Sequence, residues 1–351
     1  MSIRLWPVRG QHVAVIIVTA VLFLGATTLS LPRLSVEHSA PCKTCHINPN
    51  GGGMRTEFGN QAVALNELCI PQTKSLVAAH AVPPRIGKAL LVGFDSRYLV
   101  FDDGRVLRMQ TDVYTAFNPF KNFYYQFRFW EAGISESYAL LYLGDEQHHL
   151  KVGRFYPAFG LHDADHTAYV RERTGHPPNL YLDGVSLGFD VRGVNLTLES
   201  FNVDHQNVLG AHLYYPMQVG PLGLLAGSSV RISEKIGGTN RQFPHAKALF
   251  GAVSYDRLTL MGEFDVAGRS NDSLVAFGSL TGRVIYGLYL IGEYNFFDGD
   301  RHAQSGVDEF VRLSAEVFPL PYVEVRPSFT RYTRGARQDE NDFFVQLHFG
   351  Y

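Results

Sequence analysis

Residues 310–318 read Phe-Val-Arg-Leu-Ser-Ala-Glu-Val-Phe, and this stretch decides the fold. Every second residue from Val311 to Val317 is apolar, whereas the residues between them are Arg312, Ser314 and Glu316. Side chains alternate between the two sides of a strand, so one side would be apolar and the other polar. A soluble sandwich would bury the apolar side against a second sheet, whereas a membrane barrel turns it to lipid and keeps the polar side inside.

The same alternation recurs from about Lys88 to the end of the sequence and divides it into about sixteen segments. Most are close to the length that crosses a bilayer as a tilted strand. The segments are 88–101, 105–117, 121–132, 136–144, 148–156, 180–191, 193–203, 207–216, 221–233, 245–255, 257–267, 273–282, 284–297, 306–318, 321–333 and 341–351. We therefore expect an all-β fold, a porin-like antiparallel transmembrane β-barrel of about sixteen strands, over residues 87–351.

The connections between these segments favour a barrel in the outer membrane of a Gram-negative bacterium, with outer-membrane lipid around it. Very short turns, such as 118–119 and 192–193, alternate with longer loops, such as 234–244. Outer-membrane barrels place short turns on the periplasmic side and longer loops outside. The last segment ends on Tyr351 and resembles the strand by which such barrels are recognised for assembly. An ordinary soluble edge strand is the alternative.

The longest connection, residues 157–179, follows the fifth segment. In sixteen-stranded porins the loop at this place folds inward and narrows the pore, and the approach at 152–160 resembles porin sequences. The loop contains His162, Asp163, Asp165 and His166. Histidine and aspartate at this density could bind a metal ion such as iron. A polar, solvated constriction loop is the simpler interpretation.

Residues 1–30 are typical of a secretory signal peptide. Arg4 and Arg9 form a positive region, and an apolar run from Val13 to Leu24 follows it. The alternative is an uncleaved inner-membrane anchor, because the run approaches the length of a spanning helix if it is extended to Leu31. We favour the signal peptide, since an outer-membrane barrel cannot stay tethered to the inner membrane.

Cys42-Lys43-Thr44-Cys45-His46 is a C-x-x-C-H run, the attachment site of c-type haem. Cys42 and Cys45 would form thioethers to the porphyrin, and His46 would be the proximal ligand of the iron. A zinc site would need a second pair of ligands, and a redox dithiol would need a βαβ context. These two sites and a structural disulfide are the alternatives.

The haem motif belongs to a short segment, residues 31–86, ahead of the barrel. A segment of this size cannot form a substantial core of its own, so we expect it to dock at the periplasmic mouth of the barrel or inside its lumen. The sequence does not decide which residue is the second axial ligand of the iron, and Met54 and His80 are the candidates. Simple packing of Met54 and an exposed linker position for His80 are the alternatives.

Composition excludes several classes of protein. The formal net charge of −2 gives no reason to expect a nucleic-acid partner. No long apolar run follows the signal peptide, so helical membrane spans are not expected. Four predicted inward carboxylates could attract cations, or could pair with Arg312 and Arg326 in a solvated lumen. They belong to Glu263, Glu293, Glu316 and Glu324.

A signal peptide, one C-x-x-C-H run, a short Gly-rich segment and a barrel together resemble the fused outer-membrane cytochrome–porins of iron-oxidising bacteria. In that family a single haem carries electrons from extracellular ferrous iron to periplasmic carriers. The resemblance implies one covalent haem c, an extracellular donor or acceptor such as iron, and a periplasmic c-type cytochrome as partners. Only Cys42, Cys45 and His46 match at the level of a motif. The resemblance implies electron transfer, with Fe(II) oxidation as the candidate activity.

Two other functions fit the sequence. The first is a small-solute diffusion porin in which the haem segment is a periplasmic plug or gate. The second is a haem enzyme, which needs an open iron position and a distal acid–base residue. The sequence assigns no such residue, so the enzyme is the weaker alternative.

Overall fold

The computed structural model describes the chain from residue 31 to residue 350 apart from short gaps. The described ranges are 31–73, 85–130, 133–145, 147–161, 165–177, 180–203, 206–235, 245–268, 272–303 and 306–350. The predicted signal peptide, residues 1–30, and the candidate ligand His80 lie outside these ranges.

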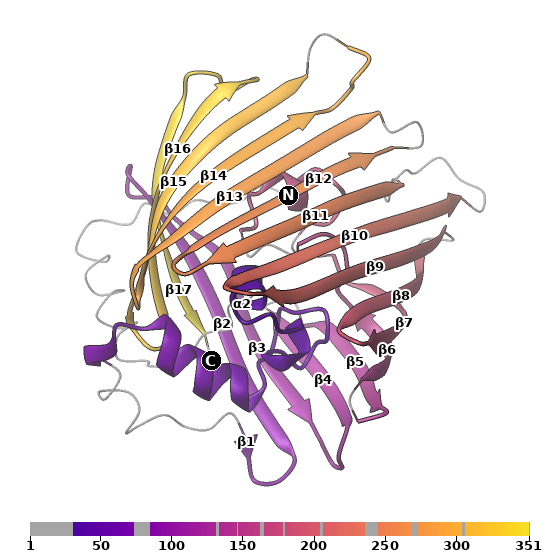
Figure 1. The fold of residues 1–351 in the computed structure, drawn as a ribbon. Coiled ribbons are helices and arrows are strands. Elements are labelled where there is room, and N and C mark those ends of the chain that lie inside the picture. The colour runs from indigo at the N-terminus through magenta and orange to yellow at the C-terminus, as the bar shows by residue number, and fades with distance from the viewer. Residues whose placement is uncertain are drawn as a thin grey trace.

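Within the described residues, sixteen strands form one closed antiparallel β-barrel (Figure 1). Consecutive strands pair with each other, and β17 (Asn341–Gly350) pairs with β2 (Leu90–Phe101) to close the ring. The other strands are β3 (Val106–Phe117), β4 (Phe123–Trp130), β5 (Gly133–Leu143), β6 (His148–Phe155), β7 (Leu182–Val191), β8 (Val194–Val203), β9 (Gln206–Val219), β10 (Leu222–Lys235), β11 (Ala246–Tyr255), β12 (Leu258–Ala267), β13 (Ser273–Ile285), β14 (Leu288–Asp298), β15 (Val307–Leu320) and β16 (Val323–Arg334). The predicted fold is confirmed, and every predicted segment overlaps one of these strands.

The two ends of the barrel differ in their connections. Turns that lead from an odd-numbered strand to the next strand meet at one end, and most of them are as short as 192–193 and 256–257. Arg192 and Gly193 both have positive φ, at 53° and 85°, as a type I′ hairpin turn requires. The longest connections, such as 156–181, lie at the opposite end. We call these the turn end and the loop end. The predicted difference between the ends holds for the longest connections, although β4–β5 and β8–β9 are joined at the loop end by only two residues each.

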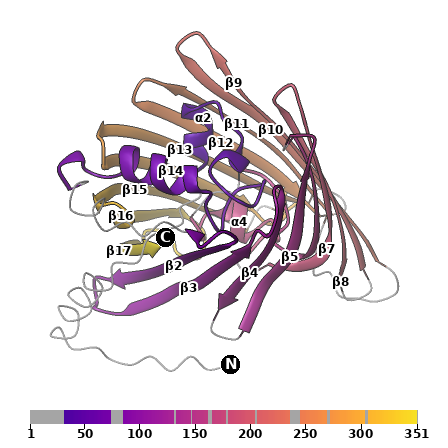
Figure 2. The ribbon, with the colours of Figure 1, turned by 90° about the horizontal axis from the view of Figure 1, so that it is seen from below.

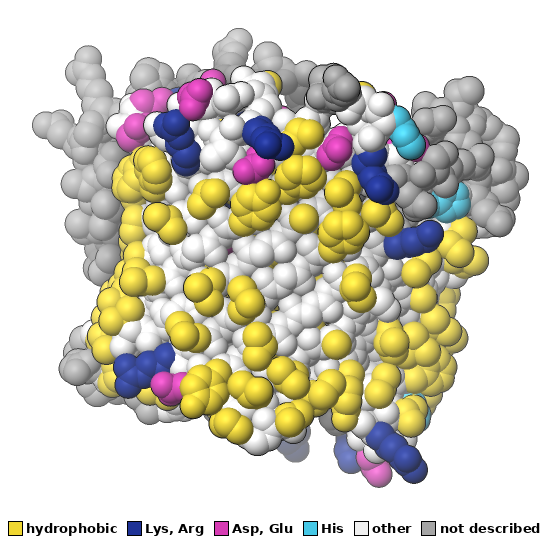
Figure 3. Space-filling model, turned by 45° about the horizontal axis from the view of Figure 1, so that its top comes forward, with side chains coloured by type: hydrophobic (Ala, Val, Ile, Leu, Met, Phe, Trp, Pro, Cys, Tyr) yellow, Lys and Arg dark blue, Asp and Glu magenta, His cyan; other side chains and the backbone are white. Residues whose placement is uncertain are grey.

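Apolar side chains of the barrel face outwards and polar side chains face the lumen, which is the reverse of a soluble protein. In β15, Leu313 is 62% exposed, whereas Arg312 is 3% exposed and Glu316 is 1% exposed. Figure 3 shows apolar side chains spread over the outer face, with charged side chains gathered towards its upper and lower edges. A barrel with lipid around it requires this arrangement, because it keeps polar groups on the lumen side. A sandwich of two packed sheets is therefore excluded.

The N-terminal segment, residues 31–73, lies partly in the lumen and partly across its turn end (Figure 2). Its elements are α2 (Pro32–Glu37), the 3₁₀ turn η1 (Cys42–Thr44), the π-helix η2 (Phe58–Leu68) and the 3₁₀ turn η3 (Pro71–Thr73). The short strand β1 (Arg85–Ile86) then pairs with β2. No helix in the described part of the chain has the length and apolar character needed to cross a membrane.

Candidate functional site

The N-terminal segment is fixed to the lumen wall by polar contacts near the turn end. Arg33 Nη2 lies 2.5 Å from Glu316 Oε2 of β15, and both side chains are buried. Lys43 Nζ lies 3.0 Å from Asp190 Oδ2, which belongs to β7. The Tyr142 hydroxyl donates to the Ile47 carbonyl at 3.0 Å. These contacts reach several different strands, so they hold the segment inside the ring.

Apolar packing supports the same placement. Val36 is fully buried, and Ile47 and Met54 pack against a cluster that includes Tyr114 and Tyr138 of the wall. Burying a Val, Ile or Met side chain contributes about 1.5–3 kcal/mol. The wall therefore supplies the core that a segment of this size lacks, as expected.

The π-helix η2 comes very close to the C-x-x-C-H motif. A Cβ atom at Gly59 would lie 2.2 Å from the carbonyl oxygen of Cys45, closer than real atoms approach. Only glycine leaves space for this contact between the helix and the motif. The Thr56 hydroxyl donates to the Thr44 carbonyl at 2.9 Å and strengthens the same junction.

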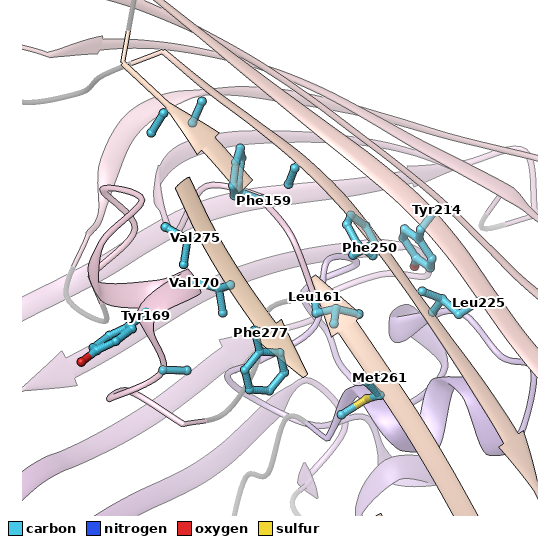
Figure 4. Packing of buried hydrophobic residues seen from close by; sticks show 14 of the residues in the cluster. Phe159, Leu161, Tyr169, Val170, Tyr214, Leu225, Phe250, Met261, Val275 and Phe277 are labelled. Atoms are coloured by element: carbon cyan, nitrogen blue, oxygen red, sulfur yellow. The ribbon is translucent and has the colours of Figure 1, made fainter. Parts of the chain in front are cut away.

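The connection between β6 and β7 folds into the lumen from the loop end, and we call its described part, 156–161, 165–177 and 180–181, the inward loop. The backbone N–H of Leu161 donates to Glu263 Oε2 at 2.7 Å, and that of Tyr169 donates to Asn295 Oδ1 at 2.9 Å. Tyr169 begins the short helix α4 (Tyr169–Glu172). Figure 4 shows Phe159, Leu161 and Val170 beside side chains of the wall strands. The predicted inward fold of this loop is confirmed.

A cavity of about 280 Å³ lies between the N-terminal segment, the inward loop and the wall. We call it the lumen cavity. Cys42, Cys45 and His46 all line it, so the structure brings the predicted haem residues together. Its other walls are largely apolar, and they include Leu161 of the inward loop and Phe250 of β11. Apolar walls with a few polar groups are typical of ligand sites, whose volumes begin at about 300 Å³.

The motif residues have the protonation states expected of buried groups. Burial raises the pKa of the Cys42 thiol, and it raises that of Cys45 to about 11. Burial and then the nearby charge of Arg55 lower the pKa of His46 to about 4. The His46 imidazole is therefore neutral at pH 7, which is the form that binds a metal ion. Neither Cys42 nor Cys45 forms a disulfide with a described cysteine.

Arg55 is a buried cation on the lining of the same cavity. It is 5% exposed, and its Nη1 and Nη2 atoms have no hydrogen-bond partner among the described residues. Burial lowers its pKa to about 10, so the side chain stays charged at pH 7. An unpaired buried charge is costly, and an anion in the cavity would relieve that cost.

The other predicted site residues lie elsewhere. Met54 is buried among wall residues, and it is not part of the lining of the lumen cavity. His162 and Asp163 lie outside the described residues. Asp165 forms an ion pair with Arg312, which outweighs the effect of burial and lowers the pKa of the carboxyl. No group of three or more His, Cys, Asp or Glu side chains that could hold a metal ion occurs in the described residues.

His166 is partly buried, and desolvation followed by the charges of Arg97 and Arg171 places its pKa well below the ordinary value. Asp165 of the predicted loop metal site is therefore paired with Arg312, whereas the lowered pKa keeps the His166 imidazole neutral, the form that binds a metal ion. The site as a whole stays a prediction, because its other two members are not described.

The inward carboxylates have partners within the lumen. Glu293 lies 3.2 Å from Arg326, Glu316 pairs with Arg33, and Glu324 Oε2 lies 2.9 Å from His348 Nδ1. Glu263 accepts from the inward loop. These contacts agree with the paired-lumen interpretation, and they leave less carboxylate charge to attract cations.

Sequence reasoning missed two residues of the lumen cavity, Arg55 and His212. His212 is a buried residue of β9, between exposed Leu209 and Leu213. Alternation along β9 places His212 on the lumen side, and that signal was available in the sequence. Nothing in the sequence indicates that the N-terminal segment docks opposite it.

No known protein family matches this sequence, and no curated protein matches it. Solved structures are similar in fold. OmpT of Vibrio cholerae is 12% identical, and the match covers 76% of this chain and 99% of that chain with a TM-score of 0.54. Pseudomonas putida OprB at low pH is 9% identical, with 80% and 96% covered and a TM-score of 0.56. Salmonella typhi OmpF in complex with daunomycin is 11% identical, with 75% and 97% covered and a TM-score of 0.54. These similarities identify the fold as that of outer-membrane porins.

Proposed function

We propose that this chain is an outer-membrane cytochrome–porin fusion that carries electrons across the membrane through one covalently bound haem c. The observation that carries the proposal is a C-x-x-C-H motif lining an apolar cavity inside a porin-like barrel. The apolar outer face supports a location in the outer membrane.

The residues of the cavity fit a haem. Cys42 and Cys45 would hold its thioethers, and neutral His46 would bind the iron. Apolar side chains would contact the porphyrin faces, and Phe58, Val63 and Leu68 of η2 are among them. Arg55 would pair with a haem carboxylate, since its Nη1 and Nη2 atoms have no hydrogen-bond partner among the described residues.

The position of the cavity supports transfer between two sides of the membrane. The N-terminal segment is bound to the lumen wall towards the turn end, and the inward loop reaches the cavity from the loop end. When bound, the haem supplies a one-electron couple, so one electron from an extracellular donor such as ferrous iron, which becomes ferric, passes to an oxidised periplasmic carrier. The side chains of the chain hold the haem, exclude water and separate the two partners.

The test uses the full-length protein with haem attached, inserted in liposomes that contain an oxidised c-type cytochrome. A membrane-impermeant ferrous complex is added outside, and the absorption bands of both haems are followed. We expect reduction of the barrel haem and then of the enclosed cytochrome. The variant Cys42→Ala/Cys45→Ala, which cannot form thioethers, should transfer no electrons. Failure of every impermeant donor and acceptor to change the haem bands would refute electron conduction.

The porin-like fold favours a second candidate, a small-solute diffusion porin with a haem-bearing gate. Conductance of the full-length haem protein in a planar bilayer distinguishes the two functions. A lumen closed by the segment gives little steady conductance. A large conductance that does not change when the haem is reduced would favour the diffusion porin.

A further inference from the structure

We propose that His212, on the barrel wall, is the second axial ligand of the haem iron. The iron would then lie between the N-terminal segment, which supplies His46, and β9, which supplies His212. The inference rests on the proposed attachment of haem to Cys42 and Cys45. It differs from the expectation that the segment itself supplies the second ligand.

His212 and His46 line the same cavity, and both side chains are buried. A second contact ties the motif to the same strand. The backbone N–H of Cys42 donates to the hydroxyl of Tyr214 at 3.2 Å, and Tyr214 is two residues beyond His212 on the lumen side of β9. The haem motif therefore docks beside His212 through a bond that does not involve the haem.

The hydrogen bonding of His212 suits a metal ligand. Its Nδ1 lies 2.9 Å from the Oγ atom of Ser229, which is the residue directly opposite on β10. The same Oγ accepts a hydrogen bond from the backbone N–H of Gly160 at 3.0 Å. If the His212 Nδ1–H also donates to it, Nε2 carries the lone pair. Metal-binding histidines commonly have their other ring nitrogen held in this way.

The ring of His212 is also held in position by aromatic neighbours. It stacks on Phe250 with a centroid distance of 5.5 Å and an interplanar angle of 13°. The ring of Tyr214 lies 5.4 Å away on its own strand. A ligand held by such neighbours loses little freedom when it binds a metal, which favours binding.

Two other described side chains, Met54 and His38, are less suitable for this role. Met54 packs among wall residues, and it does not line the lumen cavity. His38 does line the cavity, but its Nε2 lies 2.7 Å from Glu67 Oε2 and its side chain is 41% exposed. Of the two described cavity histidines other than His46, His212 is therefore the buried one, and its hydrogen bond to Ser229 leaves Nε2 to bind the iron.

Ligation by His212 would have three consequences. An iron with two imidazole ligands has a lower reduction potential than one with histidine and methionine. It also has no open position for an added ligand such as carbon monoxide, which agrees with electron transfer and not with a haem enzyme. The bond would join the N-terminal segment to the wall, so the segment could not leave the lumen while the haem is intact.

The experiment compares the haem-loaded full-length protein with His212→Ala and His212→Met. Haem attachment is measured first by the pyridine haemochrome spectrum. Low-temperature electron paramagnetic resonance and near-infrared magnetic circular dichroism of the oxidised protein then identify the axial ligands. The control is His149→Ala, which removes another buried lumen histidine that does not line this cavity.

We expect the unchanged protein and the control to be low-spin with two histidine ligands. His212→Ala should become high-spin and bind carbon monoxide when reduced, and added imidazole should restore the low-spin spectrum. His212→Met should give the near-infrared band of histidine–methionine ligation. If His212→Ala fails to fold, the spectrum of the unchanged protein and His212→Met decide the question.

A histidine–methionine or high-spin spectrum of the unchanged protein would overturn the inference, and so would a His212→Ala spectrum that stays bis-histidine without added imidazole. In both cases haem is attached and the proposed function stands. A protein that carries no thioether-bound haem would overturn the proposed function itself. The haemochrome measurement therefore separates the two failures.

Discussion

The guanidinium of Arg33 lies 2.5 Å from the carboxylate of Glu316, although the two residues are 283 positions apart in the chain. Arg33 also lies over the ring of Tyr289, 4.5 Å from its centroid. Both charged side chains are buried, so each depends on the other for compensation. The pair joins the beginning of the N-terminal segment to the lumen wall, and it provides a way to test how the segment is held.

Replacement of Glu316 by glutamine should weaken docking of the N-terminal segment. It leaves the Arg33 charge buried without its partner, and loss of one partner of a buried pair costs about 3–5 kcal/mol. We expect faster proteolysis within residues 31–73 and a larger ionic conductance in planar bilayers. The double variant Arg33→Gln/Glu316→Gln should recover much of the loss, because no charge is then left unpaired. Equal damage from the single and double variants would contradict this account, and Glu340→Gln, at an exposed site on the loop end, is the control.

Replacement of Arg55 by glutamine should lower the midpoint potential of the haem. Removal of a buried positive charge from the lining of the cavity stabilises the oxidised, more positive form of the iron. Arg55→Lys keeps the positive charge but loses the planar guanidinium, so its midpoint potential should lie between those of the unchanged protein and Arg55→Gln. A potentiometric titration followed by absorption measures all three proteins. Arg105→Gln, at an exposed position outside the cavity, should leave the potential unchanged. Equal potentials for the unchanged protein and Arg55→Gln would show that Arg55 lies away from the haem.

The barrel could be predicted from the sequence because its rule is local. Leu313 and Arg312 are adjacent, and the alternation of their types is enough to place one outside and the other inside. Turn positions follow from local chemistry as well, as at 192–193, where the structure has the tight turn that was predicted. Some observed strand boundaries differ from the predicted ones by a few residues. The predicted segments 273–282 and 284–297 leave a turn of one residue at 283, whereas the observed turn between β13 and β14 is 286–287.

The candidate site could be predicted only in part, because it depends on contacts between distant parts of the chain. The C-x-x-C-H motif is local, so Cys42, Cys45 and His46 were found. Alternation shows that His212 points inward but not which inward residues face the docked segment. No sequence pattern marks Arg55 as a site residue. It stands out only in the structure, where its Nη1 and Nη2 atoms are buried without a hydrogen-bond partner among the described residues.

Replacement of Gly59 by alanine should reduce the amount of haem attached to the protein. The added Cβ would meet the backbone carbonyl of Cys45, and a backbone atom cannot move aside without displacing the motif. The pyridine haemochrome spectrum, divided by protein concentration, should fall at least several-fold. Gly278→Ala adds the same methyl group in β13, where no atom lies within 4 Å, and it should keep full haem content. Full haem attachment in Gly59→Ala would show that η2 does not pack on the motif as described.

The contact between His38 and Glu67 should make docking of the N-terminal segment depend on pH. The hydrogen bond that the His38 ring donates to the Glu67 carboxylate raises the pKa of His38 above its ordinary value of 6.5, although both side chains are partly exposed. A raised pKa means that the contribution of the pair is complete below about pH 6.5 and is lost as the pH rises through the raised value. Proteolysis within residues 31–73, at equal protease activity, should therefore become faster as the pH rises above about 6.5. His38→Gln should remove this pH dependence, whereas His302→Gln, at an exposed site on the loop end, should keep it. A slope that is unchanged in His38→Gln would assign the pH dependence to another group.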